Sequence, residues 1–514
     1  MAPRLGRIVL SLTLGGLALA GGPGTRGLHG AAAAAVSSPN IVVLLADDLD
    51  VVSFQAAVRA GFLPNITGLF ASGTTFRQSF VSEALCSPSR ATFFTGLYPH
   101  NHRVAGNNGP HGGFDNFYRD FGDNNLALWM QAAGYRTAHV GKFVNGYEDG
   151  TFVPRGWDDW QGLVDPTTYR MYDYDVSNNG HPVHYGHRLV KDYQTDVLAG
   201  LAEDFVLSSR AQGDTRPLFL SLAPVPPHRE RDDFDGIRPA PRHYLTPRLP
   251  LPRPPSFNEE DMSDKPGWMQ KLAPVDEAAM ARLYNQRIAS MRAVDDLLGR
   301  VVAALAAVGE LERTAFVFAS DNGYLLGKHR WEAKILLYEE AIRVPLMMRV
   351  PGTAGPATVD EIVLNNDLAP TIAALAGATP GLAVDGRSLL PLLDGTATTW
   401  RRRFEVTFPP QVAGPAFDDP GTEAAPTFVP VPPFFAVRSG DDGILSDLIY
   451  AETIALVGSV VTDRELYDLR ALKDPFQLSS RHADPSYLSR RLQLKQHLDA
   501  LRTCGNGTCE ALEN

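Results

Sequence analysis

Three stretches of the chain have the pattern of buried strands. NIVVLLADD covers residues 40–48 and RTAFVFASDNG covers residues 313–323, and both are continuous apolar runs that end abruptly in acids or amides. Runs without alternation are typical of parallel strands that are buried on both faces. YRTAHVGK, at residues 135–142, is a third strand-like stretch.

Helical patterns alternate with these strands. The longest covers residues 278–309, where Leu283, Met291 and Leu298 approximate one apolar face. NLALWMQAAG (125–134) predicts a shorter helix, and ATFFTG is predicted to continue a helix from Arg90. The alternation predicts an α/β fold with a large, mixed, mostly parallel sheet flanked by helices.

Two proline-rich regions interrupt this alternation. Residues 216–255 include RLPLPRPP and are predicted to form a surface loop or lid. A second irregular region covers residues 407–433. We place a domain boundary just before it, which gives a large α/β domain at 37–405 and a small C-terminal α+β domain at 406–514, with an antiparallel sheet and a helix.

The N-terminus has the order of a secretory signal peptide. Arg4 and Arg7 precede an apolar run at residues 8–20, and a small-residue tract follows it. The run is short for a bilayer span, which needs roughly 20 residues, although an uncleaved anchor is the alternative. We expect a cleaved signal peptide at 1–36 and a secreted, extracytoplasmic protein without stable membrane insertion.

The net charge and the cysteines bear on the expected partner and on the redox compartment. The 514 residues carry a net charge of −11, whereas nucleic-acid binders usually have a basic patch, so no nucleic-acid partner is expected. Cys504 and Cys509, in TCGNGTC, are predicted to form a disulfide. Cys86 is then left as a single thiol in an oxidising compartment, which needs a chemical reason.

Oxygen-bearing side chains follow two of the predicted strands. Asp47 and Asp48 follow the first, and Asp321 and Asn322 follow the second. Functional groups of α/β sheets collect at the carboxyl ends of the strands, and four oxygen donors suit a hard cation. The pattern predicts one divalent ion, Ca²⁺ with Mg²⁺ as the alternative; a helix cap would explain either pair alone.

Several cationic residues stand in motif-like contexts. They are Arg90, Lys142, His228, His329 and Lys334. Each alone would be a surface charge or a structural histidine. Together with a metal ion they would form a pocket for a tetrahedral oxyanion.

Five motifs carry a family resemblance. ALCSPSRATFFTG resembles the first signature of the sulfatases and GYRTAHVGK the second, and PNIVVLLADD, SDNGYLLGKH and LYEEAIRVPLMMR occur in the expected order. The chain is similar to formylglycine-dependent sulfatases of the alkaline phosphatase superfamily. LYPHNHRV, GKFVNGY and ASDNGY are most similar to the N-acetylglucosamine-6-sulfatase and heparan endosulfatase branch.

The resemblance implies a role for each candidate. A formylglycine-generating enzyme would oxidise Cys86 to formylglycine. The hydrated aldehyde of this residue offers one hydroxyl to attack sulfur and a second to expel sulfate. An oxygen of residue 86 would complete the metal site. Lys142, Lys334 and Arg90 would offset negative charge, and His228 would protonate the leaving alcohol or bind sulfate. His329 is a further candidate for a sulfate or substrate contact.

One position departs from many sulfatases. The histidine expected two residues after Lys142 is replaced by Val144, as in the glucosamine-6-sulfatase branch. The base that drives elimination is therefore unidentified. His102, in PHNHRV, is a candidate for substrate binding, for a base or for a structural role.

Alternatives remain within and outside this family. A broad arylsulfatase or a phosphonate or phosphate ester hydrolase would share the fold, and a glycan-binding protein with an unmodified Cys86 would share the pocket. The expected substrate is a sulfated glycan with 6-O-sulfated N-acetylglucosamine, or an aryl sulfate. Loops 106–120 and 224–255 are expected to set specificity.

Overall fold

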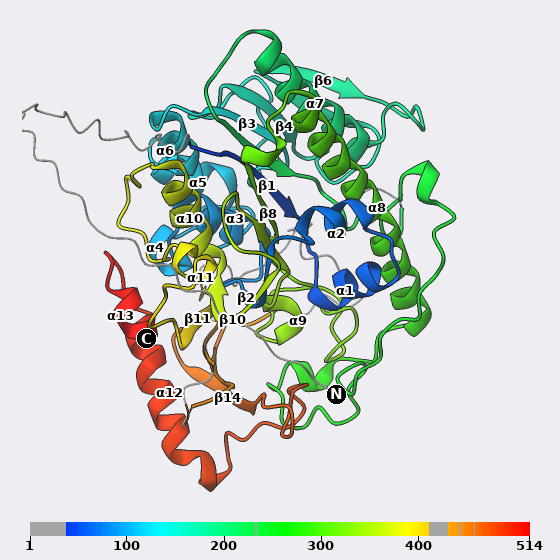
Figure 1. Cartoon of the computed structure of the whole chain (residues 1–514). Helices are drawn as coiled ribbons and strands as arrows, with labels where there is room; N and C mark the ends of the chain where they lie inside the picture. Colours follow the sequence, from blue (N-terminus) through cyan, green and yellow to red (C-terminus); the bar gives the residue numbers. More distant parts are fainter. Residues whose placement is uncertain (1–37, 232–233, 411–429, 441–442, 444, 457) are drawn as a thin grey trace, which may run out of the picture. The chain divides into compact units, whose positions relative to one another are not determined.

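The strands gather into two sheets of different size (Figure 1). This computed structural model describes residues 38–231, 234–410, 430–440, 443, 445–456 and 458–514. The larger sheet has ten strands. In spatial order they are β10 (Ala357–Leu364), β2 (Thr74–Phe80), β9 (Leu346–Arg349), β8 (Thr314–Ser320), β1 (Asn40–Ala46), β7 (Leu218–Ala223), β3 (Arg136–Gly141), β4 (Asp159–Val164), β5 (Tyr174–Asn178) and β6 (His181–Tyr185).

The centre of the large sheet is parallel. Strands β8, β1, β7, β3 and β4 run in the same direction, whereas β9, β5 and β6 are antiparallel to their neighbours. The predicted mixed, mostly parallel sheet is confirmed. Successive residues of β1 enter opposite cores: Val42, Leu44 and Ala46 on one face, and Ile41, Val43 and Leu45 on the other. Burial on both faces explains the continuous apolar run.

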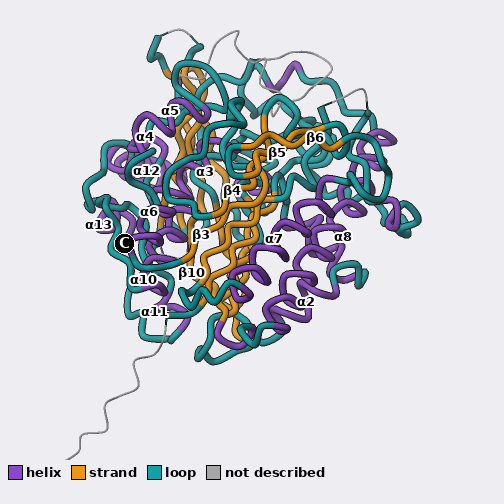
Figure 2. The backbone as a smooth tube through the Cα atoms, turned by 90° about the horizontal axis from the view of Figure 1, so that it is seen from above, coloured by secondary structure: helices purple, strands orange, loops and turns teal. Residues whose placement is uncertain are grey.

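Helices cover both faces of this sheet (Figure 2). One face carries α1 (Val51–Arg59), α2 (Pro64–Phe70), α7 (Gln194–Ala211) and α8 (Glu277–Ala307). The other carries α3 (Cys86–Thr95), α5 (Gly113–Phe121), α6 (Leu126–Ala132) and α10 (Leu368–Ala376). Shorter elements are α4 (Pro99–His102), α9 (Glu339–Ile342), α11 (Leu390–Leu393) and 3₁₀ turns at Pro241–His243, Met269–Lys271, Leu311–Arg313, Asn365–Asp367 and Pro485–Tyr487.

The prediction of a loop over residues 216–255 is wrong at its start. Strand β7 lies there, fully buried between β1 and β3. Pro217 and Pro224 flank the strand instead of interrupting it, and a proline is tolerated at a strand end because no ladder hydrogen bond is lost there. The proline density of the region masked the short apolar run LFLSLA.

The smaller sheet is antiparallel and lies in the C-terminal part of the chain. Its strands are β11 (Arg403–Phe408), β12 (Phe434–Ser439), β13 (Leu448–Ile454) and β14 (Val461–Asp468). Helix α12 (Leu488–Leu501) packs against it, and the Phe80 and Phe404 rings, 5.0 Å apart, connect the two sheets. The predicted antiparallel sheet with a helix is confirmed. The domain division at 405/406 stays a prediction, since residues 38–514 form one compact unit and the boundary falls inside β11.

Some predictions fall outside the described residues. These are the signal peptide at 1–36 and most of the irregular region at 407–433. Among the helices that the structure describes, none combines the length and apolarity needed to cross a bilayer. The predicted disulfide joins Cys504 to Cys509.

The last helix, α13 (Cys509–Glu513), ends in a buried carboxylate, that of Glu513. Glu513 is fully buried and accepts a hydrogen bond from Arg401 Nε at 2.9 Å. Arg401 also donates to both oxygens of Asp367, at 2.6 and 2.8 Å. Tyr98 and Arg387 donate to Glu513 as well. The C-terminus is thus held by a buried, charge-assisted network.

We expect Glu513→Ala to lower the free energy of unfolding by about 3–5 kcal/mol, because it removes the buried carboxylate that Arg401 and Arg387 share and leaves Asp367 to compensate Arg401 alone. Chemical denaturation measures the loss. Glu510→Ala is the matched control, since its side chain is 60% exposed on the same helix and the change should leave stability close to wild type. Equal losses in the two variants would contradict this account.

Candidate active site

The carboxyl ends of β1 and β8 bring four predicted residues together. The strands pair in register, with Ala46 beside Ser320. Directly after them, Asp321 Oδ1 accepts a hydrogen bond from the Asp48 amide at 3.1 Å, and Asn322 Nδ2 donates to Asp48 Oδ1 at 2.7 Å. Asp47 is fully buried beside them. The expected meeting of the two strand ends is present.

Cys86 is the first residue of α3 and faces this cluster. Its side chain is fully buried, and Sγ lies 3.6 Å from Asp47 Oδ1 and 2.8 Å from Lys334 Nζ. Burial raises the pKa of the thiol to about 12, although the nearby lysines oppose this. An unmodified Cys86 is therefore a neutral thiol at physiological pH, which is a poor nucleophile.

Three cations pair with the three carboxylates. Lys142 Nζ lies 2.6 Å from Asp47 Oδ2, Arg90 Nε lies 2.8 Å from Asp321 Oδ2, and Lys334 donates to Asp48. Burial alone would raise the pKa of Asp47, but Lys142, with His228 and Arg90, holds that pKa well below its usual value. The aspartate is therefore ionised and able to bind a cation.

His228 points one ring nitrogen at the cluster. Nδ1 lies 2.6 Å from the Arg229 carbonyl oxygen, which makes it the donor, and Nε2 lies 3.7 Å from Asp48 Oδ2. Burial lowers the pKa of His228 to about 4. One ligand atom each from Asp47, Asp48, Cys86 and His228 lie within 4.8 Å of one another.

The donor set fits a hard divalent cation. Asp47, Asp48 and Asp321 offer carboxylate oxygens and Asn322 an amide oxygen, and this Asn322 Oδ1 is buried with no hydrogen-bond partner among the described residues. Burial, with the nearby Asp47, raises the pKa of Asp321 to about 6. A bound cation would satisfy the orphaned amide oxygen and favour the ionised carboxylates.

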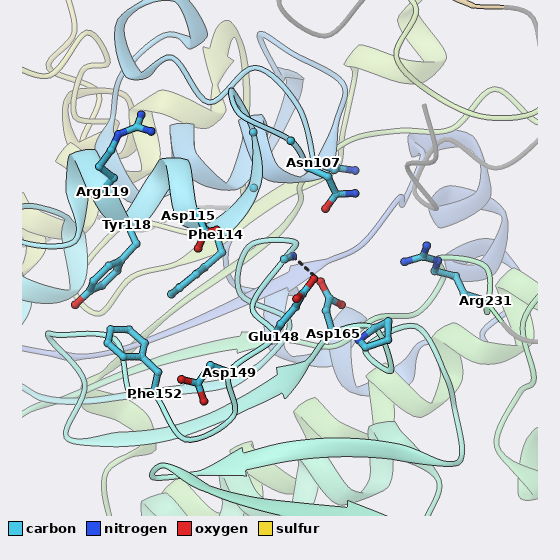
Figure 3. Close-up of a pocket in the computed structure, with 16 residues that line it drawn as sticks. Asn107, Phe114, Asp115, Tyr118, Arg119, Glu148, Asp149, Phe152, Asp165 and Arg231 are labelled. Atoms are coloured by element: carbon cyan, nitrogen blue, oxygen red, sulfur yellow. Dashed lines mark hydrogen bonds between the residues drawn. The ribbon is translucent and has the colours of Figure 1, made fainter. Parts of the chain in front are cut away.

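A cavity of about 800 Å³ is lined by residues from 107–119, 146–152 and 165–166 and by Arg231, and not by the clustered residues themselves (Figure 3). It connects to α3 through Asn107, whose Oδ1 accepts a hydrogen bond from the Ser87 amide at 2.8 Å. Residues 107–119 form much of its lining, and Arg231 approaches from the other side. Both loops that were expected to set specificity therefore contribute to it.

Comparison with known proteins places these features in one family. The sulfatase family profile matches residues 39–378, which is more than half of the chain. The chain belongs to the sulfatase family.

Named sulfatases align with it over different lengths. The N-acetylglucosamine-6-sulfatase of Homo sapiens is 31% identical over 95% of this chain and 88% of its own length. An extracellular sulfatase of Drosophila melanogaster is 33% identical over 69% of this chain, and the chain spans 31% of that relative's length. A structure solved with its substrate D-glucosamine-2-N,6-O-disulfate has a TM-score of 0.67 at 22% identity, covering 90% of this chain and 97% of that one, and this likeness shows the fold.

Three residues that contact one another at this candidate site, Tyr169, Asn145 and Ser87, were not predicted from the motifs. Tyr169 places its ring 4.8 Å from Lys142 Nζ, and its hydroxyl accepts a hydrogen bond from Asn145 Nδ2 at 2.5 Å. Asn145 Oδ1 in turn accepts one from Ser87 Oγ at 3.0 Å. Asn145 belongs to the motif GKFVNGY, so it could have been predicted as a site residue. The sequence around Tyr169 contains no motif that would have indicated its role.

A fourth missed residue, Arg287, supports the site from α8. It is fully buried and donates to the backbone carbonyls of Asp48 and of Pro227, the latter at 3.0 Å. Asp48 has a left-handed φ of 67°, so this contact helps to hold an uncommon backbone conformation. An arginine on the apolar face of a long helix is the signal that could have revealed it.

Two predicted histidines lie in other surroundings. His329 Nδ1 is 2.6 Å from Glu259 Oε2 and its ring stacks on Tyr338 at 3.8 Å. His102 Nε2 lies 2.9 Å from Thr92 Oγ1, and Nδ1 accepts from the Val104 amide at 3.0 Å. Among the described residues, neither has a hydrogen bond or ion pair with the Cys86 cluster. His102 instead braces α3.

We expect unmodified Cys86 to resist alkylation in the folded protein. Its burial and raised pKa should slow reaction with iodoacetamide at pH 8 by on the order of a hundredfold or more relative to the unfolded chain. Protein made without a formylglycine-generating enzyme is the sample, and peptide mass spectrometry is the measurement. Rapid labelling before unfolding would contradict the buried position.

Proposed function

We propose that this protein hydrolyses sulfate esters through a formylglycine made from Cys86. The observation that carries the proposal is the position of Cys86 at the start of α3, buried between the Asp47 carboxylate and the Lys334 ammonium. A thiol held neutral there has no evident catalytic use. The hydrated aldehyde of formylglycine would supply a hydroxyl nucleophile for sulfur at the same place.

The metal site is assigned to the two strand ends. Asp47, Asp48, Asp321 and Asn322 would hold one divalent cation together with an oxygen of modified residue 86, and we favour Ca²⁺ over Mg²⁺ because the ligand set is rich in carboxylates. Such an ion would neutralise charge on the sulfuryl oxygens. Arg90 fixes the orientation of Asp321, since its Nε donates to that carboxylate.

The protein's own cations complete the anion site. Lys142 and Lys334 are fully buried and would contact the sulfate, where a low dielectric strengthens their attraction to developing charge. We assign His228 Nε2 to a contact with the oxygen of the departing alcohol, because it has no hydrogen-bond partner among the described residues; Nε2 of the neutral ring would first have to take up a proton before it could protonate that oxygen. His102 is given no role as a base, since both its ring nitrogens are engaged.

The substrate that we propose is a 6-O-sulfated N-acetylglucosamine unit of a glycan. Support comes from the name of the human relative, which aligns over nearly the whole chain, and from the motifs LYPHNHRV and GKFVNGY. The extracellular relative and the signal-like N-terminus support export, with a formylglycine-generating enzyme as the partner during maturation. Broad arylsulfatase or phosphonate ester hydrolase activity is the alternative.

Protein matured with a formylglycine-generating enzyme should carry an aldehyde at residue 86. The peptide that contains ALCSPSR should lose its sulfur, gain one oxygen and react with a hydrazide probe. Cys86→Ala should lower turnover of an aryl sulfate by at least about a thousandfold, since the nucleophile is removed. Far-UV circular dichroism of the variant should match wild type.

Two outcomes would contradict this proposal. Full activity with an alkylatable thiol at residue 86 would require another nucleophile. A higher kcat/KM for phosphonate monoesters than for every sulfate ester tested would assign the site to phosphonate chemistry instead.

Metal analysis tests the ligand assignment. We expect about one Ca²⁺ per chain in purified protein, and Asp321→Ala should lower the metal content and the activity together. Asp261→Asn is the control, because Asp261 is exposed and only caps Ser263. Stoichiometric zinc, or an unchanged calcium content in Asp321→Ala, would exclude the proposed site.

A further inference from the structure

The cavity that Asn107 helps to line has aromatic walls and an acidic lining. Phe114, Tyr118 and Phe152 pack together, with ring centroids 5.0 to 6.1 Å apart. The charged residues that line it are Asp115, Arg119, Glu148, Asp149, Asp165 and Arg231. Aromatic faces with a few polar groups are typical of sites for small organic ligands, including sugar rings.

The negative charge of this lining is only partly neutralised. Four carboxylates face two guanidinium groups, and one of these, Arg119, already bonds the neighbouring Asp120 at 2.8 Å. Figure 3 shows Glu148 and Asp165 side by side near the middle of the cavity. Asp165 Oδ2 accepts a hydrogen bond from the Gly146 amide at 2.6 Å, which fixes its carboxylate in place.

Two polar atoms at this cavity lack partners. Asn107 is 1% exposed, and its Nδ2 has no hydrogen-bond partner among the described residues. The same holds for Asp165 Oδ1. A buried amide donor and a buried carboxylate acceptor without partners are expected where a ligand supplies them. Hydroxyl groups of a sugar can satisfy both, because each can donate and accept.

Side-chain contacts link the cavity lining to the residues around Cys86. The Tyr169 ring lies 4.8 Å from Lys142 Nζ and 4.4 Å from the His228 ring, and Arg231, which lines the cavity, lies 5.3 Å from the same ring. Asn107 holds the Ser87 amide next to Cys86. A sulfate ester bound at residue 86 would therefore extend its alcohol toward this cavity.

We propose that the cavity binds the sugar of the sulfate ester and selects a hexosamine that carries no second anionic group. The inference rests on the function proposed above and deepens it. The sulfate being cleaved meets the lysines and the metal ligands, whereas a further sulfate or carboxylate on the ring would meet the carboxylates of Glu148, Asp149 and Asp165. An acetamido group or an ammonium group has no such repulsion.

Electrostatics gives the expected size of the preference. Like charges about 4–6 Å apart at a partly exposed site repel strongly enough to change kcat/KM by roughly tenfold or more. The effect depends on charge and not on shape. It should therefore shrink as added salt screens the carboxylates.

The test compares three monosaccharides with the formylglycine-containing protein: N-acetylglucosamine 6-sulfate, glucosamine 6-sulfate and glucosamine 2-N,6-O-disulfate. We expect kcat/KM to be at least about tenfold higher for each of the first two than for the disulfate. Glu148→Gln should reduce this ratio, and Glu148→Lys should reduce it further. Glu312→Gln is the matched control, because that side chain is 84% exposed at the opposite end of β8 and should leave the ratio unchanged.

The outcomes separate this inference from the proposed function. A disulfate cleaved as well as the other sugars, or a ratio that Glu148→Lys leaves unchanged, would overturn the selection. Turnover of an aryl sulfate but of none of the three sugars would overturn the sugar site and leave sulfate-ester hydrolysis standing. Failure to cleave any sulfate ester, with the aldehyde present, would overturn the proposed function itself.

Discussion

The burial of opposite charges at the ends of β1 and β8 is the constraint on which the site depends. Asp47, Asp48 and Asp321 are almost completely excluded from solvent, as are Arg90, Lys142 and Lys334. An isolated buried charge is strongly unfavourable, so each group has to meet its partner with good geometry. The parallel register of the two strands, the start of α3 and the end of β3 are fixed together by this requirement.

Much of the architecture could be predicted because short stretches of the sequence carry the pattern of the element that they form. The apolar run at 40–46 has no alternation, and that pattern alone indicates a strand covered on both faces. β7 was missed for the opposite reason: a six-residue run with five apolar residues and Ser221, between two prolines, resembles a loop until the neighbouring strands β1 and β3 are known. Strand pairing is a property of distant segments and leaves no mark in a short window.

The site divides in the same way. The residues with a formal charge or a motif, such as Asp47, Cys86 and Lys334, were recognisable one by one. Tyr169 and Arg287 act through contacts with residues more than fifty positions away, with His228 and Asp48 respectively, and their roles depend on folding. His329 as a sulfate or substrate contact stays a prediction, and its Nδ1 lies 2.6 Å from Glu259 Oε2.

The complete burial of Cys86 has a consequence for the order of events in maturation. In the folded protein the thiol is fully buried at the start of α3, between Asp47 and Lys334, and the residues of α3 that follow it are buried as well, so an enzyme cannot bind the surrounding peptide there. Under the proposed maturation, the oxidising enzyme would have to bind Cys-Ser-Pro-Ser-Arg before Arg90 pairs with Asp321. Oxidation of Cys86 would therefore compete with folding. A chain that folds first would keep the unmodified thiol and would be folded but inactive.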